Sequence, residues 1–173
     1  MLSKKMSDAL NTHMNLELFS AHLYLVMSSC ANDMGLKGAA NWFFVQYREE
    51  MLHFMKFYTY LTDQGVIISM PANKAVPNKY KSLLDIMQKT LAHEQLITSC
   101  INNLSEQAVQ EKDHATQIFL QWFVTEQIEE ENNDRDLIAK LKLIGDNGHG
   151  ILMIDGEMGQ RLFVVPAGSP LAV

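Results

Sequence analysis

Apolar and small residues recur at alternating intervals of four and three residues in four separate stretches of the chain. This spacing keeps them on one side of a helix, so each stretch predicts a helix with one buried stripe. The stripes run from Leu10 to Ser28, from Ala39 to Tyr60, from Leu83 to Leu104 and from Phe123 to Leu141. A shorter segment, Gly148 to Gln160, has Ile151, Ile154 and Met158 on one side and predicts a fifth, short helix.

The connections between these stretches differ in length. Gly35 and Gly38 interrupt the pattern between the first two helices, and Lys112-Asp113-His114 interrupts it between the last two. Both of these links are short, and short links join helices that lie antiparallel to one another.

The middle link, from Gly65 to Lys81, is long and has no helical period. It contains Pro71, Pro77 and a strand-like Val66-Ile67-Ile68. About 17 extended residues can span roughly 55 Å, whereas a helix of about 27 residues is only about 40 Å long. The link can therefore run the length of a bundle and leave the second and third helices parallel. The predicted fold class is all-α: a four-helix bundle with a long crossover loop and a short fifth helix.

The composition and charge of the chain exclude some classes of function but do not identify its function. At 173 residues, with 47% hydrophobic and 20% charged residues, the chain has the composition of a single globular domain. The formal net charge of −6 argues against binding to nucleic acid or to an anionic membrane. Two isolated cysteines, no membrane-length apolar run and no apolar core near the N-terminus predict a reduced, cytoplasmic protein.

Six positions on the predicted stripes carry polar side chains with metal-binding atoms. They are Glu17, Glu50, His53, Glu94, Gln127 and Glu130. A glutamate buried among apolar residues has to be neutralised, paired with a cation or bound to a metal. The central parts of the stripes contain no lysine or arginine, and His53 can neutralise one carboxylate at most. A divalent or trivalent cation is therefore the counter-charge that we expect.

The spacing of these residues and their chemistry indicate which metal to expect. Glu50 and His53 are three residues apart, as are Gln127 and Glu130, which places each pair on one face of its helix. Carboxylate oxygens with a single imidazole suit iron or manganese, whereas zinc and copper sites usually contain thiolate or several histidines. One inward glutamate alone is more often a salt-bridged residue. A candidate ligand on the stripe of all four helices favours a metal centre.

Longer motifs around these residues resemble the bacterial non-haem ferritins. The resemblance rests on Asn15-Leu16-Glu17-Leu18, Tyr24, Glu49-Glu50-Met51-Leu52-His53, His93-Glu94-Gln95, the run from Phe119 to Glu131, and Ile154-Asp155-Gly156-Glu157-Met158-Gly159. It covers about residues 1–160, which we expect to form a ferritin-like di-iron domain. Residues 161–173 match nothing in the family and form a tail of unknown role. The general pattern of inward glutamates with Glu-x-x-His is the one described for ferritin-like proteins.

The resemblance implies a role for each matching residue. Glu17, Glu50 and His53 match the ligands of a first iron, and Glu50 would bridge to a second iron. Glu94 and Glu130 match ligands of that second iron, with Gln127 beside it. A third iron site is implied by matches at Glu49, Glu126, Glu129 and Glu130. Tyr24 matches a tyrosine that can supply an electron to the oxygen intermediate, although taken alone it reads equally well as a core tyrosine. Glu50, His53 and Tyr24 are thus the expected catalytic residues.

The function implied by the resemblance is iron storage with ferroxidase activity. Fe(II) would be oxidised by O2 or H2O2 at a dinuclear centre and stored as a mineral inside a shell of 24 identical subunits. Two departures refine this expectation. Gln127-x-x-Glu130 stands where bacterioferritin-like centres repeat Glu-x-x-His, which favours a weakly held second iron. Met51 stands where bacterioferritins ligate haem, but non-haem relatives also carry methionine there, so we do not expect haem.

Three other functions share part of this pattern. A di-iron enzyme that reduces peroxide or oxygen without storing mineral would use the same ligands, but rubrerythrin-like peroxidases usually add a second iron site held by four cysteines. A DNA-protecting mini-ferritin would place its ligands across a dimer interface and often carries a basic tail, whereas this tail is apolar. A structural bundle without metal would leave the inward carboxylates unexplained.

Overall fold

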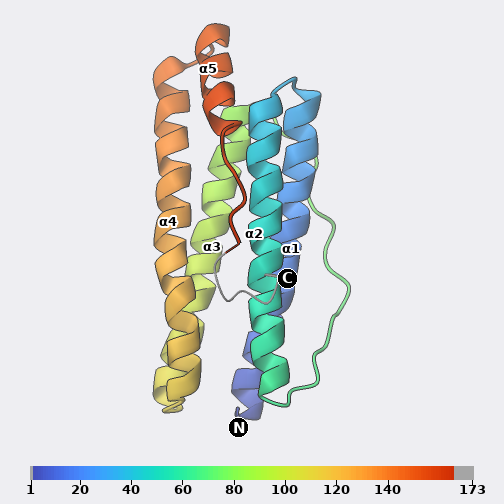
Figure 1. Ribbon diagram of the computed structural model, residues 1–173, viewed down its shortest axis with the longest axis vertical. Helices are drawn as coiled ribbons and strands as arrows, with labels where there is room; N and C mark the ends of the chain where they lie inside the picture. The colour runs from blue at the N-terminus through green and yellow to red at the C-terminus, as the bar shows by residue number, and fades with distance from the viewer. Residues whose placement is uncertain (1, 166–173) are drawn as a thin grey trace. The chain divides into compact units, whose positions relative to one another are not determined.

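The computed structural model describes residues 2–165 and contains five helices within them (Figure 1). The helices are α1 (Lys4–Asp33), α2 (Lys37–Asp63), α3 (Leu83–Gln110), α4 (His114–Ile144) and α5 (Gly148–Met158). Every predicted helix is present, and no strand occurs in this part of the chain. Val66-Ile67-Ile68 is irregular backbone, and the Ile67 side chain is 96% exposed, so its strand-like composition reflects no sheet. Most of the predicted tail, residues 166–173, lies outside the described residues.

The described residues divide into two compact units. The first contains residues 10–80 and 146–165, and therefore most of α1, all of α2, the long link and α5. The second contains residues 2–9 and 81–145, and therefore the start of α1 with α3 and α4. Each predicted short link joins two helices of the same unit.

In the first unit α1 and α2 lie antiparallel, as the short link between them predicts. The rings of His13 and Phe57 lie 4.8 Å apart at one end of the pair. At the other end the Ser28 hydroxyl donates a hydrogen bond of 2.7 Å to the backbone oxygen of Ala40. The start of α1 thus lies beside the end of α2, and the end of α1 lies beside the start of α2.

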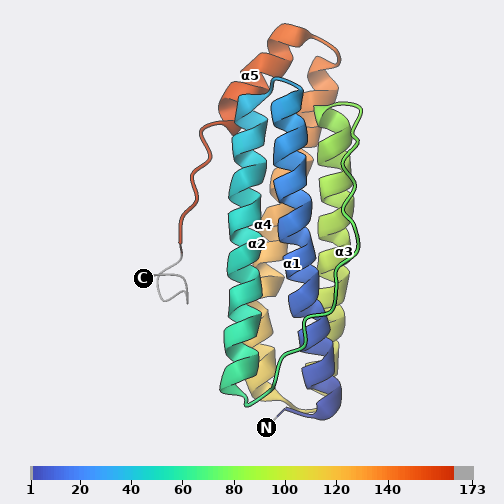
Figure 2. The same ribbon diagram turned by 90° about the vertical axis from the view of Figure 1, so that its right-hand side faces the viewer.

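The long link runs back along α1 (Figure 2). Near its start, the Asn11 side chain accepts a hydrogen bond from the backbone N–H of Ser69 and donates one to the Ser69 oxygen, which also accepts from Asn15. Near its end, the Cys30 thiol donates to the backbone oxygen of Asn78 at 3.5 Å. The link therefore returns the chain to the end of α1 at which α2 begins, as its length predicts.

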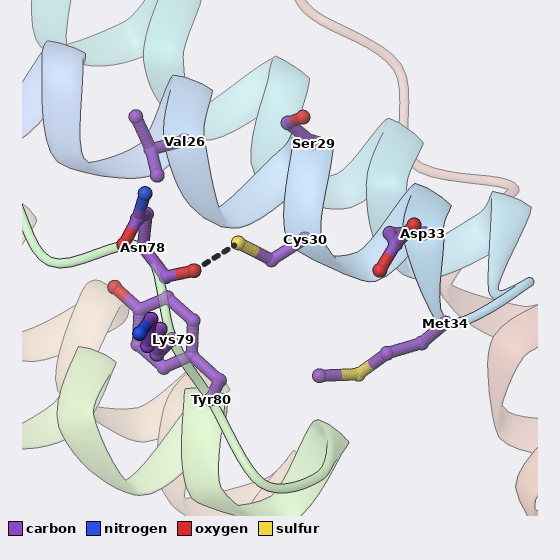
Figure 3. Close-up of a pocket in the computed structure, with 8 residues that line it drawn as sticks. All are labelled: Val26, Ser29, Cys30, Asp33, Met34, Asn78, Lys79 and Tyr80. Carbon is purple, nitrogen blue, oxygen red and sulfur yellow. Dashed lines mark hydrogen bonds between the residues drawn. The ribbon is translucent and has the colours of Figure 1, made fainter.

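The link and α1 enclose a pocket of about 620 Å³ (Figure 3). Cys30 lines it together with Asp33, Asn78 and Tyr80. Burial, and next the nearby Asp33 carboxylate, raise the pKa of the Cys30 thiol, because both disfavour the thiolate. This thiol is therefore a weak nucleophile, and its contact with Asn78 is a structural one.

Gly38 allows α5 to pack against α2. A Cβ atom at Gly38 would lie 1.6 Å from the backbone oxygen of Asp155, so no larger residue fits without displacing α5. One residue further along, the backbone N–H of Ala39 donates a hydrogen bond of 2.8 Å to the Asp155 carboxylate. From the sequence pattern, Gly38 is interpreted as part of the break between the first two helices. That interpretation is wrong, because Gly38 is a buried residue within the first turn of α2.

In the second unit α3 and α4 also lie antiparallel. The Gln117 amide donates to the backbone oxygen of Ala108 near the connecting turn, and the Thr98 hydroxyl donates to Glu131 at 2.7 Å further along. The Asp113 side chain caps the N-terminus of α4 by accepting the backbone N–H of Thr116 at 3.1 Å. The predicted punctuation at 112–114 is thus a tight turn followed by a helix cap.

Candidate metal centre

Three of the predicted ligands come together within the first unit. Glu17 projects from the middle of α1, and Glu50 and His53 project from one face of α2. One ligand atom from each lies within 4.8 Å of the other two, and all three side chains are buried. Two carboxylates and one imidazole at this separation can reach a single cation. Carboxylate oxygens together with one imidazole nitrogen form a ligand set that suits iron. The residues therefore fit the metal that the sequence predicts.

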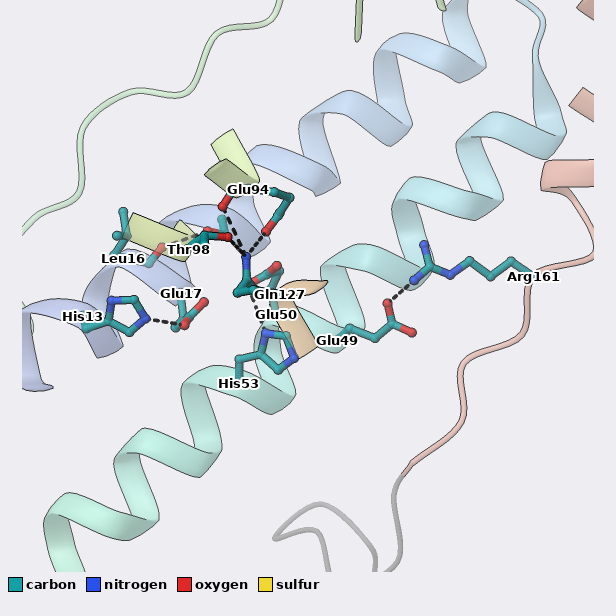
Figure 4. A network of polar contacts seen from close by, with 11 residues as sticks. His13, Leu16, Glu17, Glu49, Glu50, His53, Glu94, Thr98, Gln127 and Arg161 are labelled. Atoms are coloured by element: carbon teal, nitrogen blue, oxygen red, sulfur yellow. Dashed lines mark hydrogen bonds and ion pairs between the residues drawn. The ribbon is translucent and has the colours of Figure 1, made fainter. Parts of the chain in front are cut away.

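A histidine that the sequence prediction omitted lies beside this cluster. His13 is buried one helical turn before Glu17 on α1, and its Nε2 lies 2.7 Å from the Glu17 carboxylate (Figure 4). The cluster therefore contains a second histidine beside His53, the one histidine that the stripe pattern identifies. The signal was available, because a spacing of four residues puts His13 on the face that Glu17 occupies. Leu10 and Met14 define the same stripe with apolar side chains, which hides the polar His13 between them.

The protonation states of this cluster suit metal binding. Burial alone raises the pKa of Glu17, but the charge of His13 and hydrogen bonds with His13 and Glu50 outweigh it and lower the pKa to about 2. Burial lowers the pKa of His53 to about 4, with Lys56 and His13 acting in the same direction against Glu17. At neutral pH Glu17 is therefore an anion and His53 is a neutral imidazole. These are the forms in which both side chains coordinate metals.

The predicted ligands on α3 and α4 are buried within the second unit. The Gln127 amide donates to the Glu94 carboxylate at 3.0 Å and to the backbone oxygen of Glu94 at 3.2 Å. Glu130 lies one turn further along α4 and is also buried. Glu94 and Gln127 are thus joined by hydrogen bonds, and Gln127 holds the Glu94 carboxylate in one orientation.

Apart from the buried Glu130, the glutamates predicted for a third iron site are less buried. Glu126 is half-buried on α4, and Glu129 is exposed. Glu49 on α2 is 20% exposed and accepts a hydrogen bond of 2.6 Å from the Arg161 guanidinium, which the sequence prediction did not anticipate (Figure 4). Helical periodicity cannot identify Arg161 as a partner of Glu49, because Arg161 lies in irregular backbone after α5.

Two further predicted residues have clear structural surroundings. Tyr24 is fully buried on α1, and its ring stacks against Phe43 of α2 with centroids 6.3 Å apart. Met51 is half-buried on α2. Asp134, one helical turn after Glu130 on α4, is also fully buried.

A family model described as a ferritin-like domain matches residues 7–144. The chain belongs to the ferritin-like family. This ferritin-like chain is 42% identical over 155 residues to the bacterial non-heme ferritin of Campylobacter jejuni, with 90% of this chain and 93% of that one covered. It is 39% identical over 163 residues to the bacterial non-heme ferritin of Staphylococcus aureus, covering 94% and 98% of the two chains.

Solved structures agree with the sequence relatives. The ferritin-like chain superposes on an open-pore ferritin from Archaeoglobus fulgidus with a TM-score of 0.92 and 41% identity, covering 94% of this chain and 100% of that one. A humanized archaeal ferritin gives a TM-score of 0.94 at 41% identity, with 95% and 100% covered. The predicted all-α ferritin fold and the resemblance to bacterial non-haem ferritins are therefore confirmed. Within residues 2–165, no helix has the length and apolarity to cross a membrane.

Proposed function

We propose that this chain stores iron and oxidises Fe(II) to Fe(III) before storage. Membership of the ferritin-like family supports a role in iron storage. The observation that carries the ferroxidase proposal is the buried cluster of Glu17, Glu50 and His53, whose ligand atoms lie within 4.8 Å of one another. The buried carboxylates of Glu17 on α1 and Glu50 on α2 favour binding of Fe(II), which is the substrate of the proposed reaction.

The proposed roles follow the surroundings of each residue. Glu17 and His53 would hold a first iron, Glu50 would bridge it to a second, and Glu94, Gln127 and Glu130 would serve the second iron. Tyr24 would supply an electron during oxidation, and Glu49, Glu126 and Glu129 would hold a third iron together with Glu130. His13 acts on Glu17, since it keeps that carboxylate ionised and fixes its orientation. The oxidant, O2 or H2O2, accepts the electrons that Fe(II) gives up.

The proposal extends to the assembly and the setting of the protein. We propose a homo-oligomeric shell of 24 subunits that encloses the mineral, in the cytoplasm, with no nucleic-acid or membrane partner. The net charge of −6 for each chain supports an affinity of such an assembly for cations and disfavours polyanionic partners.

Iron loading tests this proposal directly. Fe(II) is added in air to the metal-free protein, the mixture is passed over a sizing column, and the iron that elutes with the protein is measured. We expect many irons for each subunit in a peak of shell size. About two irons for each subunit without further growth would indicate the di-iron enzyme that reduces oxygen or peroxide, and no retained iron would exclude both functions.

Substitution of the bridging residue tests the centre itself. Glu50→Ala should slow Fe(II) oxidation by about a hundredfold or more, because it removes a ligand proposed for both irons. Glu50→Gln keeps the shape of the side chain and should slow oxidation similarly while unfolding less readily. Glu106→Ala, which removes an exposed glutamate of α3, is the control and should oxidise Fe(II) normally. An unchanged rate in both Glu50 variants would exclude the proposed centre.

A further inference from the structure

The segment that follows α5 lies along α2. The Asn41 side chain of α2 donates hydrogen bonds to two backbone oxygens of this segment, those of Gly159 at 3.4 Å and Arg161 at 3.0 Å. Figures 1 and 2 both show the chain descending beside α2 after α5. The backbone at Arg161 is thus fixed against the same helix that carries Glu49.

The Arg161 side chain then reaches the Glu49 carboxylate. Its Nη2 donates to Oε2 of Glu49 at 2.6 Å, and both side chains are only 20% exposed. The guanidinium also lies over the Trp42 ring, 4.5 Å from the ring centre. Partial burial and a flat aromatic neighbour both strengthen a charge-assisted hydrogen bond, because less water competes for the two charges.

A second contact of the same kind holds the next part of the segment. The guanidinium of Arg48 lies 4.1 Å from the centre of the Phe163 ring. Arg48 and Glu49 are neighbours on α2, so the segment is attached on both sides of the Arg161–Glu49 pair. The pair is therefore part of a docked segment and not a chance encounter of two long surface side chains.

One nitrogen of the Arg161 guanidinium disfavours the docked position of this side chain. Nη1 of Arg161 is buried and has no hydrogen-bond partner among the described residues. A buried donor without a partner disfavours this conformation. The ion pair with Glu49 and the contact with Trp42 offset that cost, which makes Glu49 the group that holds the guanidinium in place.

A cation that binds at Glu49 has to compete with this arrangement. One carboxylate oxygen is already engaged, and the guanidinium charge repels a second cation at the other oxygen. We propose that Arg161 is an internal counter-ion of Glu49 that weakens metal binding at the third iron position and is displaced when that position fills. The inference rests on the proposed function, because that function assigns Glu49 to a third iron, and it gives the segment after α5 a role in regulating the same site.

Metal titration without redox chemistry tests the inference. Zn²⁺ is titrated into the metal-free assembled protein by calorimetry, and the number of sites and their affinities are compared between variants. In Arg161→Gln, the third site should bind Zn²⁺ about tenfold more tightly than in the wild type, while the first two sites stay unchanged. Arg161→Lys keeps the positive charge and should stay close to the wild type. Lys89→Gln removes one positive charge from a pair with Asp85 and should change nothing.

A double substitution separates the pair from other effects of Arg161. In Arg161→Gln combined with Glu49→Gln, the gain at the third site should disappear. A third-site affinity that is unchanged in Arg161→Gln, or a gain that survives loss of the Glu49 charge, would overturn this inference and leave the proposed function intact. Failure of the wild type to bind Zn²⁺ at all would overturn the proposed function and this inference together.

Discussion

At the level of single residues, the proposed metal-binding cluster depends on a contact with a side chain that is not itself a proposed ligand. His13 lies 2.7 Å from Glu17 in a buried environment, and its charge contributes to lowering the pKa of Glu17 to about 2. The same histidine packs its ring against Phe57. His13 therefore combines an electrostatic role and a packing role, which substitution can separate.

His13→Phe tests the electrostatic role while retaining a ring against Phe57. The change leaves Glu17 without its cation, and an unpaired buried charge should reduce the free energy of unfolding of the metal-free protein by about 2–4 kcal/mol. Bound Zn²⁺ should restore most of that loss, since the metal supplies the missing positive charge. Thermal unfolding with and without Zn²⁺ measures both effects.

The matched control is His22→Phe, which changes an exposed histidine of the same helix and should leave stability unchanged. A metal-free His13→Phe protein as stable as the wild type would contradict the electrostatic role of His13.

The residue-level predictions from sequence succeed where helical periodicity applies. Glu17, Glu50, Glu94 and Glu130 are all buried, as their stripe positions predict. Periodicity could not reveal Arg161, because that residue reaches Glu49 from irregular backbone 112 positions away.

At the level of helices, the docking of α5 depends on one residue of α2. Gly38 leaves no room for a Cβ atom, which would meet the Asp155 backbone oxygen at 1.6 Å. The sequence pattern identifies a break near this position but not its purpose. A glycine that ends a helix and a glycine that admits a second helix look the same in a single sequence.

Gly38→Ala should displace α5 from α2. The steric conflict is with backbone, which cannot rotate away as a side chain can, so we expect a loss of about 1–3 kcal/mol or detachment of α5. Hydrogen exchange of the α5 amides, with the melting temperature, measures the change. Gly156→Ala, where a Cβ atom meets nothing within 4 Å, is the control and should stabilise α5 slightly. Equal protection of α5 in the two variants would contradict the packing role of Gly38.

At the level of the whole chain, hydrophobic spacing and link lengths were sufficient to predict the fold class. The long link was interpretable because its extended length exceeds that of a helix, and its contacts with Asn11 and Cys30 at the two ends of α1 agree with that interpretation. The association of Arg48 with Phe163 was not predictable, because it depends on where the end of α5 directs the chain. Short-range patterns predict helices, whereas contacts of irregular segments follow only from the packed structure.

The charge of the whole chain leads to the last prediction. Each chain has a net charge of −6, and an assembly of identical chains multiplies that charge, so Fe(II) should be attracted before it reaches any ligand. Salt shortens the range of this attraction to about 8 Å at physiological ionic strength. The initial rate of Fe(II) oxidation at low iron concentration should therefore fall about tenfold as ionic strength rises from low to physiological values. At saturating Fe(II), capture no longer limits the rate, and salt should have little effect. A rate at low iron that does not depend on salt would mean that the ligands at the centre, and not the net charge, govern the capture of iron.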